Sequence, residues 1–357
     1  MNGRRLRRAA LLTGAVLTLG AAAFGLWYHF VGTGLFTRAA PRGRTAATSP
    51  TESGDVALSP EWREVYQKGL EASEALADVK DPVEALNMLE GMFEDAKART
   101  HLQESIGELT RVILLCEDLS RRWPDAEEAL GARKLVYRCR LEMAEPEKAY
   151  EAFADYAQAV GGLAEGQALR SGSDTESAKA EGQQAASSVF YEEASRLFEE
   201  EDYVEAMRCL STIIMQYPQT RACAKAYCLM GRYYLSLRQA EPAIAAYQKA
   251  IETGTDETTL REGYNRLSTV LFDVGRQEEA VGLLEEMGQR LQSEDGKAYA
   301  MFKTGLYEYL RGQAFYPDAL VRLKKFVETY PKDRRVQEAK GLIERMQKEA
   351  MGSATSP

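Results

Sequence analysis

Histidine and cysteine are the side chains on which nucleophilic catalysis or a zinc site would depend in this chain, and they are few. Of the two histidines, His29 falls in an uncharged apolar run, and His101 stands alone near a predicted helix start. Serine–histidine or cysteine–histidine catalysis would therefore depend on His101 with no supporting motif nearby. We predict a surface or capping histidine at this position.

The five cysteines show neither the spacing of a zinc knuckle nor a C-x-x-C redox pair. Their number is odd and the chain is long, so a disulfide framework is not expected. We predict that they are buried on helices as small apolar residues, with one disulfide as the alternative if the domain faces an oxidising compartment. The cysteines are Cys116, Cys139, Cys209, Cys223 and Cys228.

Acidic runs are a second candidate for chemistry, because clustered carboxylates can bind cations. At helical spacing these runs spread around a helix instead of converging, and no calcium-binding loop is present. The chain also lacks a P-loop, an H-E-x-x-H and a G-x-S-x-G sequence. We predict that it is not an enzyme and has no catalytic residue, cofactor or metal site; a hydrolase is the alternative from a different class. The runs are Glu192–Glu193, Glu199–Asp202, Glu278–Glu279 and Glu285–Glu286.

Charge is distributed unevenly along the chain. The formal net charge is −9, but residues 1–54 contain seven arginines and one acidic residue, which gives +6. The remaining residues therefore sum to −15. A body this acidic argues against nucleic acid as a partner, because the phosphate backbone would be repelled.

The N-terminus is predicted to be a membrane element. Residues 1–8 form a basic tail with four arginines, and residues 9–31 contain no charged side chain. As a helix at about 1.5 Å per residue, the uncharged run is about 34 Å long, enough for a bilayer core of about 30 Å. We predict a single-pass transmembrane signal-anchor at 9–31 in the inner (cytoplasmic) membrane, with the tail in the cytoplasm.

A cleaved signal peptide is the alternative, because Ala21–Ala23 offers an A-x-A cleavage site after a short apolar core. The product would be secreted or periplasmic, so both interpretations place the rest of the chain outside the cytoplasm. Residues 32–58 are rich in Pro, Thr, Ser, Gly and Ala and lack an apolar period. They are predicted to be a flexible linker.

From residue 59 onward, apolar residues recur at intervals of three and four, which predicts helices and no strands. Several helices are predicted to begin at a proline, because the missing amide hydrogen is not needed in the first helical turn. Asp81 is a suitable N-cap for one of them. The prolines are Pro60, Pro82, Pro146 and Pro242.

A repeated pattern within these helices alternates small and bulky residues. Two helices can approach closely only where a small residue faces a bulky one, and Gly231 is predicted to take such a crossing position. The clearest copy contains Tyr227, Gly231, Tyr234, Ala243, Tyr247 and Ala250. The pattern resembles the tetratricopeptide repeat (TPR) family. This resemblance implies an all-α fold: an α-solenoid of antiparallel helical hairpins in a right-handed superhelix.

The repeat period and the helix ends favour a particular variety of the family. Ala206, Ala243 and Ala280 are each 37 residues apart, which exceeds the usual period of about 34. A fourth copy has a slightly longer turn around Tyr316–Pro317. Second helices are predicted to end at aromatic–proline pairs, as in the extended repeats of bacterial envelope proteins. These pairs are Trp123–Pro124, Tyr217–Pro218 and Tyr330–Pro331.

Three segments follow the linker in the predicted domain organisation. Residues 59–160 form degenerate TPR-like hairpins. Residues 161–186, rich in Gly, Ser, Ala and Glu, are a joint or linker between two lobes, centred near Gly172–Ser173, or else a polar helix extension. Residues 187–350 form an array of about four repeats with a closing helix from Arg334 to Met351, because a stack of repeats needs a capped end.

First-helix residues line the binding groove in this family, so the resemblance implies a groove at five positions. Tyr233 has an alternative role in packing against the next repeat. The implied function is a membrane-anchored extracytoplasmic scaffold that binds an envelope protein or peptide and contacts the bilayer through 9–31. The alternative is a chaperone-like holder of exported polypeptides near the secretion translocon. The groove residues are Arg232, Tyr233, Arg238, Asn265 and Lys303.

Overall fold

The computed structural model describes Leu76 and residues 79–353, with side chains up to residue 349. These residues belong to one unit, Ser59–Pro357. The predicted segments 1–8, 9–31 and 32–58 lie outside the described residues. Among the helices that are described, none is both long and apolar enough to cross a bilayer.

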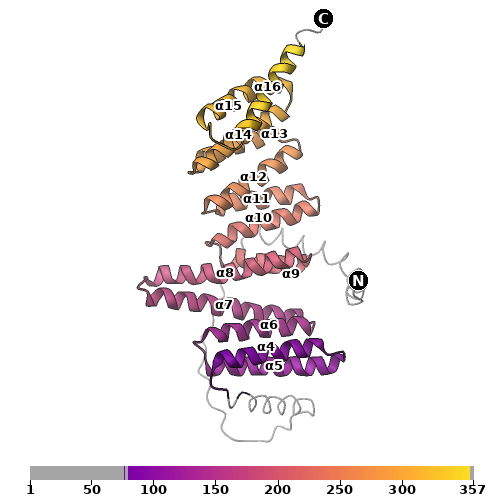
Figure 1. Cartoon of the computed structure of the whole chain (residues 1–357), viewed down its shortest axis with the longest axis vertical. Coiled ribbons are helices and arrows are strands. Elements are labelled where there is room, and N and C mark those ends of the chain that lie inside the picture. Colours follow the sequence, from indigo (N-terminus) through magenta and orange to yellow (C-terminus); the bar gives the residue numbers. More distant parts are fainter. Residues whose placement is uncertain (1–75, 77–78, 354–357) are drawn as a thin grey trace, which may run out of the picture. The chain divides into compact units, whose positions relative to one another are not determined.

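The described residues form helices and no strand, and each helix packs against the next one in the chain (Figure 1). This confirms the all-α class and the repeated hairpins; the handedness of the superhelix stays a prediction. The helices are α4 (Pro82–Ala98), α5 (Leu102–Arg122), α6 (Glu127–Glu142), α7 (Pro146–Arg170), α8 (Thr175–Glu199), α9 (Tyr203–Gln216), α10 (Arg221–Ser236), α11 (Ala240–Thr253), α12 (Glu257–Asp273), α13 (Gln277–Arg290), α14 (Glu294–Leu310), η1 (Gln313–Phe315), α15 (Tyr316–Thr329) and α16 (Val336–Ser353).

Of the predicted proline starts, Pro82 and Pro146 begin α4 and α7, and Pro60 lies outside the described residues. The Asp81 carboxylate accepts a hydrogen bond of 3.2 Å from the amide of Val83 at the start of α4. His101 is exposed and occupies the N-cap position of α5 without a side-chain capping bond. Pro242 is the third residue of α11 and not the first. The difference is tolerated because the first four amide groups of a helix have no intrahelical partner.

The helices α6, α7, α8, α10 and α12 end in the same left-handed turn. The amide three residues beyond the helix donates to a carbonyl five residues earlier, as in the bond of 2.9 Å from Gln239 to Tyr234. The residue directly before the donating amide has positive φ, a conformation that glycine adopts most easily. These residues are Ala144 (57°), Gly172 (95°), Glu201 (63°), Arg238 (58°) and Gly275 (86°).

The turns after α5, α9 and α15 confirm the aromatic–proline prediction. The aromatic residue is the C-cap in each case, with ψ between 48° and 65°. The following proline forces this change because its ring excludes helical backbone at the preceding residue. The aromatic carbonyl then accepts a bond from the amide three residues later, at 3.0 to 3.2 Å. The three caps are Trp123, Tyr217 and Tyr330.

One buried small residue marks the helix crossing in each of four hairpins. The four positions are spaced by 37 residues, and a methyl group added at Gly231 would lie 2.6 Å from the Tyr247 ring. The fourth hairpin is two residues longer because η1 is inserted before α15. The small residues are Ala194, Gly231, Ser268 and Gly305.

Residues 161–186 differ from the predicted joint between two lobes. They lie on α7 and α8, which are 25 residues each and pack against one another, with a turn only at residues 171–174. Gly161 and Gly182 face each other so closely that a methyl group on either would lie 2.8 Å from the other's carbonyl oxygen. The absence of a side chain at Gly161 and Gly182 therefore allows the backbones of α7 and α8 to approach closely.

The cysteines are free and buried on helices, as predicted. Their exposed fractions are 3% or less. Burial raises the pKa of the thiols of Cys139, Cys209 and Cys228 to about 12, so they stay protonated and unreactive near neutral pH.

Gly231→Leu is expected to lower the free energy of unfolding by about 1–3 kcal/mol, because the new side chain would occupy the space of the Tyr247 ring. Urea unfolding followed by circular dichroism measures the change. Gly282→Ala on α13 is the matched control: its methyl group meets nothing within 4 Å, so we expect a gain of about 0.5–1 kcal/mol. An unchanged midpoint for Gly231→Leu would contradict the assigned crossing.

Candidate functional site

A polar cluster joins α12 and α14 around Lys303. The Lys303 ammonium donates to the Asn265 side-chain oxygen and lies 3.4 Å from the Thr269 hydroxyl. It also lies 5.7 Å from the ring centroid of Tyr299 and 5.2 Å from that of Tyr307. The ammonium is therefore held by two polar groups and two aromatic faces.

Helical spacing places these side chains together. Tyr299, Lys303 and Tyr307 are four residues apart on α14 and share one face. Asn265 and Thr269 have the same spacing on α12. The Tyr299 hydroxyl donates to Asn265 at 2.6 Å, and the hydroxyls of Tyr307 and Thr269 are 3.1 Å apart. The first helices of two successive repeats, α12 and α14, thus meet through paired polar contacts.

Lys303 has an unusual electrostatic environment for a lysine. Burial lowers its pKa to about 8, and the nearby Arg266 adds to the effect while Asp273 opposes it. Lys303 forms no ion pair with any carboxylate in the described part of the chain. A half-buried ammonium without a counter-ion is costly, so the site favours an added negative charge.

A cavity of about 290 Å³ lies beside this cluster, between α10, α11 and α12. It combines an apolar part with a polar rim, and two of its rim residues, Asn265 and Thr269, contact Lys303. The cavity is lined by Leu235, Arg238, Ala240, Asn265, Arg266, Thr269, Val270, Asp273 and Val274.

Arg238 enters this cavity from a strained turn. Its φ of 58° is unfavourable for a residue with a side chain, and glycine occupies the matching position in the next repeat, at Gly275. The exposed Arg238 side chain makes no hydrogen bond or ion pair with the described residues. Its guanidinium is therefore available to a ligand of the cavity.

The structure separates the five predicted groove residues into two groups. Arg238 and Asn265 line the cavity and Lys303 contacts its rim. Arg232 instead lies over the Phe198 ring, 5.1 Å from its centroid. The half-buried Tyr233 ring contacts the rings of Tyr203 and Tyr234 at 5.4 and 5.6 Å, so it packs toward the preceding hairpin.

Sequence reasoning missed several members of the cluster, although a signal was present. Arg266 and Lys303 are 37 residues apart and therefore occupy equivalent positions of successive first helices. Their partners on α12 and α14 also repeat at four-residue spacing. Aligning the repeats position by position would have found them. The missed residues are Arg266, Thr269, Tyr299 and Tyr307.

The acidic runs do not converge on a metal site. Nowhere in residues 79–353 do three or more His, Cys, Asp or Glu side chains meet in a way that could hold a metal ion. Several of their carboxylates instead pair with arginines of the same or the neighbouring helix. The pairs are Glu193–Arg196, Glu200–Arg196, Glu278–Arg311, Glu279–Arg276 and Glu285–Arg322.

No protein-family model and no curated protein matches the chain. Solved structures of other proteins are similar to the chain, among them the following three. The first is a chain of the Cut9–Hcn1 hetero-tetramer of the APC/C, at 14% identity and a TM-score of 0.33, covering 78% of this chain and only 55% of that one. The second is the TPR domain of P58(IPK), at 15% identity and a TM-score of 0.27, covering 72% of this chain and 77% of that one.

The third similar structure is BtubC from P. vanneervenii, at 17% identity and a TM-score of 0.26. The match covers 65% of this chain and 90% of that one. Superpositions this loose carry no argument about function. The assignment of a helical repeat array therefore rests on the packing described above.

Lys303→Met is expected to raise the free energy of unfolding near neutral pH, because it removes a partly desolvated charge. Solvent still screens the half-buried ammonium, so the gain should be only about 1 kcal/mol. Because the folded pKa lies near 8 and the unfolded one near 10.5, the cost of the charged lysine is complete below pH 8. It disappears as the pH rises through both values, so the advantage of the variant should shrink.

Urea unfolding of both proteins from about pH 7 to about pH 10 measures this difference. Lys225→Met on the exposed surface of α10 is the control and should change stability little. A pH-independent loss of stability in Lys303→Met would contradict the assigned environment.

Proposed function

We propose that the face formed by α10, α12 and α14 binds an acidic segment of a partner protein. The observation that carries this proposal is Lys303, an ammonium held half-buried among polar and aromatic groups without an ion pair to any described carboxylate. The influence of Asp273 on it is outweighed by burial and by Arg266. A carboxylate from a partner would supply the missing charge. The TPR-like pattern of the repeats supports a protein as the ligand.

The cavity indicates what such a segment contains. Arg238 and Arg266 in its lining and Lys303 beside it present three cations. The carboxylates nearby are Asp273 in the lining and Glu262, which lies 3.9 Å from Arg266. Its apolar part accommodates an aliphatic side chain, so the segment would carry an apolar residue next to an acidic one. The apolar lining consists of Leu235, Ala240, Val270 and Val274.

The local charge also provides specificity. The body of the chain sums to −15, so it repels acidic proteins in general. A small cationic cavity in this background accepts an acidic group only where the partner's shape brings that group to Lys303. Complementary charge of this kind speeds association and excludes wrong partners.

The proposal extends to location: the chain is a scaffold anchored in the cytoplasmic membrane by 9–31, with its repeats outside the cytoplasm. The basic tail, the uncharged run and the polar linker support this placement. A short tether would hold the binding face near other envelope proteins and raise their effective concentration.

Arg238→Gly is expected to separate stability from binding. Removing the side chain from its left-handed conformation should stabilise the fold by about 0.5–1 kcal/mol. It should also lower the affinity for a fluorescein-labelled Glu-rich peptide by about three- to tenfold, because a cation of the cavity is lost. Fluorescence anisotropy measures this affinity. A Gln-for-Glu version of the peptide serves as the uncharged probe.

Glu201→Gly is the matched control, because Glu201 occupies the same turn position one repeat earlier, with φ of 63°. It should stabilise the fold to a similar extent and leave peptide binding unchanged. Equal affinities for wild type and Arg238→Gly, or equal binding of the two peptides, would count against the acidic-ligand proposal.

Deleting residues 9–31 is expected to move the protein from the membrane fraction to the soluble fraction of cells, because the deleted run is the only uncharged stretch of that length in the sequence. Immunoblotting of fractionated cells measures the change. A full-length protein already in the soluble fraction would refute the anchor.

Crosslinking in intact cells identifies the partners of the full-length protein. A short stoichiometric set of envelope proteins supports the scaffold, and a broad set of exported polypeptides supports the chaperone-like holder.

A further inference from the structure

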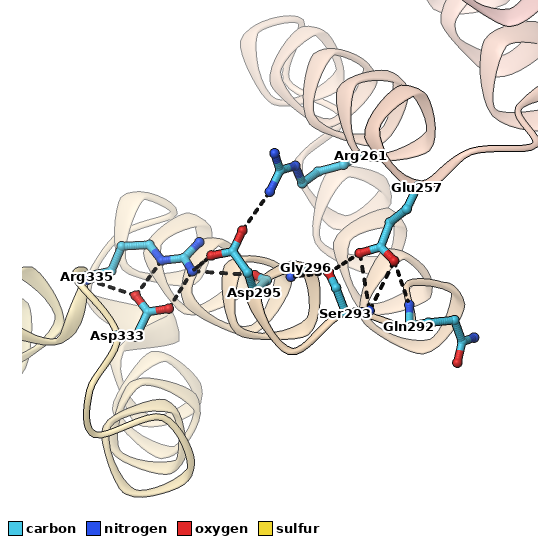
Figure 2. Close-up of polar contacts among 8 residues, drawn as sticks. All are labelled: Glu257, Arg261, Gln292, Ser293, Asp295, Gly296, Asp333 and Arg335. Carbon is cyan, nitrogen blue, oxygen red and sulfur yellow. Dashed lines mark hydrogen bonds and ion pairs between the residues drawn. The ribbon is translucent and has the colours of Figure 1, made fainter. Parts of the chain in front are cut away.

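The loop before the closing helix α16 is tied to the first helices of the two preceding repeats. Asp295 on α14 receives the Arg261 guanidinium of α12 at 2.7 Å and the Arg335 guanidinium at 2.9 Å (Figure 2). The same Arg335 guanidinium also pairs with Asp333 (Figure 2). The contacts thus form a continuous chain from α12 through α14 to the loop before α16.

The same end of the array has a second link. The Glu257 carboxylate, at the first position of α12, receives the backbone amides of Gln292 and Ser293 at 3.1 to 3.3 Å and also the Ser293 hydroxyl (Figure 2). Ser293 in turn caps α14 through the Gly296 amide at 3.0 Å. The first turn of α14, which contains Asp295, is therefore fixed against α12.

Arg335 is held in a single orientation. It is 8% exposed, and its Nε and Nη2 donate to the two Asp333 oxygens at 2.7 and 2.6 Å. Nη2 also donates to Asp295, and the Arg335 amide donates to Asp333 at 2.9 Å. A guanidinium bound along its fork in this way has a fixed plane.

That fixed plane lies against the binding cluster. The Arg335 guanidinium is 5.3 Å from the Tyr299 ring centroid. The hydroxyl of the same tyrosine donates to Asn265 at 2.6 Å, and Asn265 accepts the Lys303 ammonium. A path of direct contacts therefore leads from the loop before α16, through one aromatic ring, to the proposed ligand-binding lysine.

We propose that Arg335 is a positioning residue for the binding site: by holding the Tyr299 ring, it sets the places of Asn265 and Lys303. The closing segment is then part of the recognition unit as well as the end of the stack. This inference rests on the proposed function of the α10–α12–α14 face, but its first test does not require a ligand.

The charged groups near Tyr299 and Lys303 define what a variant would change. On α12 these are Arg261, Arg266 and Asp273, and on α14 the nearest is Asp295. Removing the Arg335 guanidinium would free the Tyr299 ring, admit water to Lys303 and remove a positive charge. Loosening the ring weakens a cation–π contact that favours the charged lysine. The entry of water and the loss of a positive charge both favour the charged form and are expected to outweigh it, so the pKa of the Lys303 ammonium should rise above about 8.

The first test measures the pKa of Lys303 by NMR titration of protein labelled with ¹³C-lysine, in wild type and Arg335→Gln. The pKa should rise in the variant. Arg322→Gln is the matched control, because Arg322 also pairs with two carboxylates, Glu308 and Glu285, but does not contact Tyr299. An unchanged Lys303 pKa in folded Arg335→Gln would overturn the positioning role.

The second test is a double-mutant cycle of Arg335→Gln with Asn265→Ala, using the fluorescein-labelled Glu-rich peptide. Arg335→Gln alone should weaken binding by about three- to thirtyfold, as expected for a change along a contact network. In the Asn265→Ala background its effect should largely disappear, because the path ends at Asn265. Fully additive effects would mean that Arg335 acts only through general stability, and would overturn the proposal.

Two further results keep the outcomes distinct. If Arg335→Gln does not fold, Arg335→Lys retains the charge, loses the fork and should raise the Lys303 pKa in the same direction by less. If Asn265→Ala and Lys303→Met leave peptide binding unchanged while Arg335→Gln still shifts the Lys303 pKa, the proposed function fails and the positioning of Lys303 by Arg335 stands.

Discussion

The close crossing of the two helices in each hairpin is the constraint on which the rest of the structure depends. At Gly231 the backbone of α10 leaves room for only the Tyr247 ring, so the two helices can meet at one depth and in one register. Repetition of a small residue every 37 positions carries that register along the chain. Arg266 and Lys303, which share a register position, therefore face the same side of successive first helices.

The turns preserve this register, and they also show why strain alone does not identify a functional residue. Ala144, Glu201 and Arg238 all adopt the left-handed conformation at equivalent turns. Each sacrifices some stability relative to glycine. Only Arg238 also lines a cavity next to an ammonium without a counter-ion. It is this combination of strain, cavity and unbalanced charge that separates a candidate binding residue from an ordinary turn residue.

Local features could be predicted from sequence, and features that depend on pairing could not. The aromatic–proline turns and the Asp81 cap depend on neighbouring residues, and they were predicted correctly. Residues 161–186 were assigned to a joint or a helix extension because glycine-rich composition also occurs in linkers. The contact between Gly161 and Gly182 exists only because α7 and α8 run side by side, which composition does not show.

The same distinction applies to the groove. Positions on first helices led to Asn265 and Lys303, which the structure brings together. Adjacent residues on a helix point about 100° apart, so the assignment of Arg232 and Tyr233 depended on the rotation of α10. Their contacts with the preceding hairpin could not be foreseen without it. The contact between Arg335 and Tyr299 depends on the conformation of the loop before α16, so it was even less predictable from the sequence.

The proposed site gains affinity from the way Lys303 is held before any ligand arrives. A carboxylate that approaches an exposed lysine must remove water from the ammonium and fix its flexible side chain. At Lys303 both changes are largely complete in the folded protein, because two tyrosine rings and Asn265 already surround the ammonium. The cost is borne by folding. Since ligand and proton both favour the charged lysine, their binding is coupled: an acidic partner raises the Lys303 pKa, and the complex takes up a proton wherever the free site is partly deprotonated.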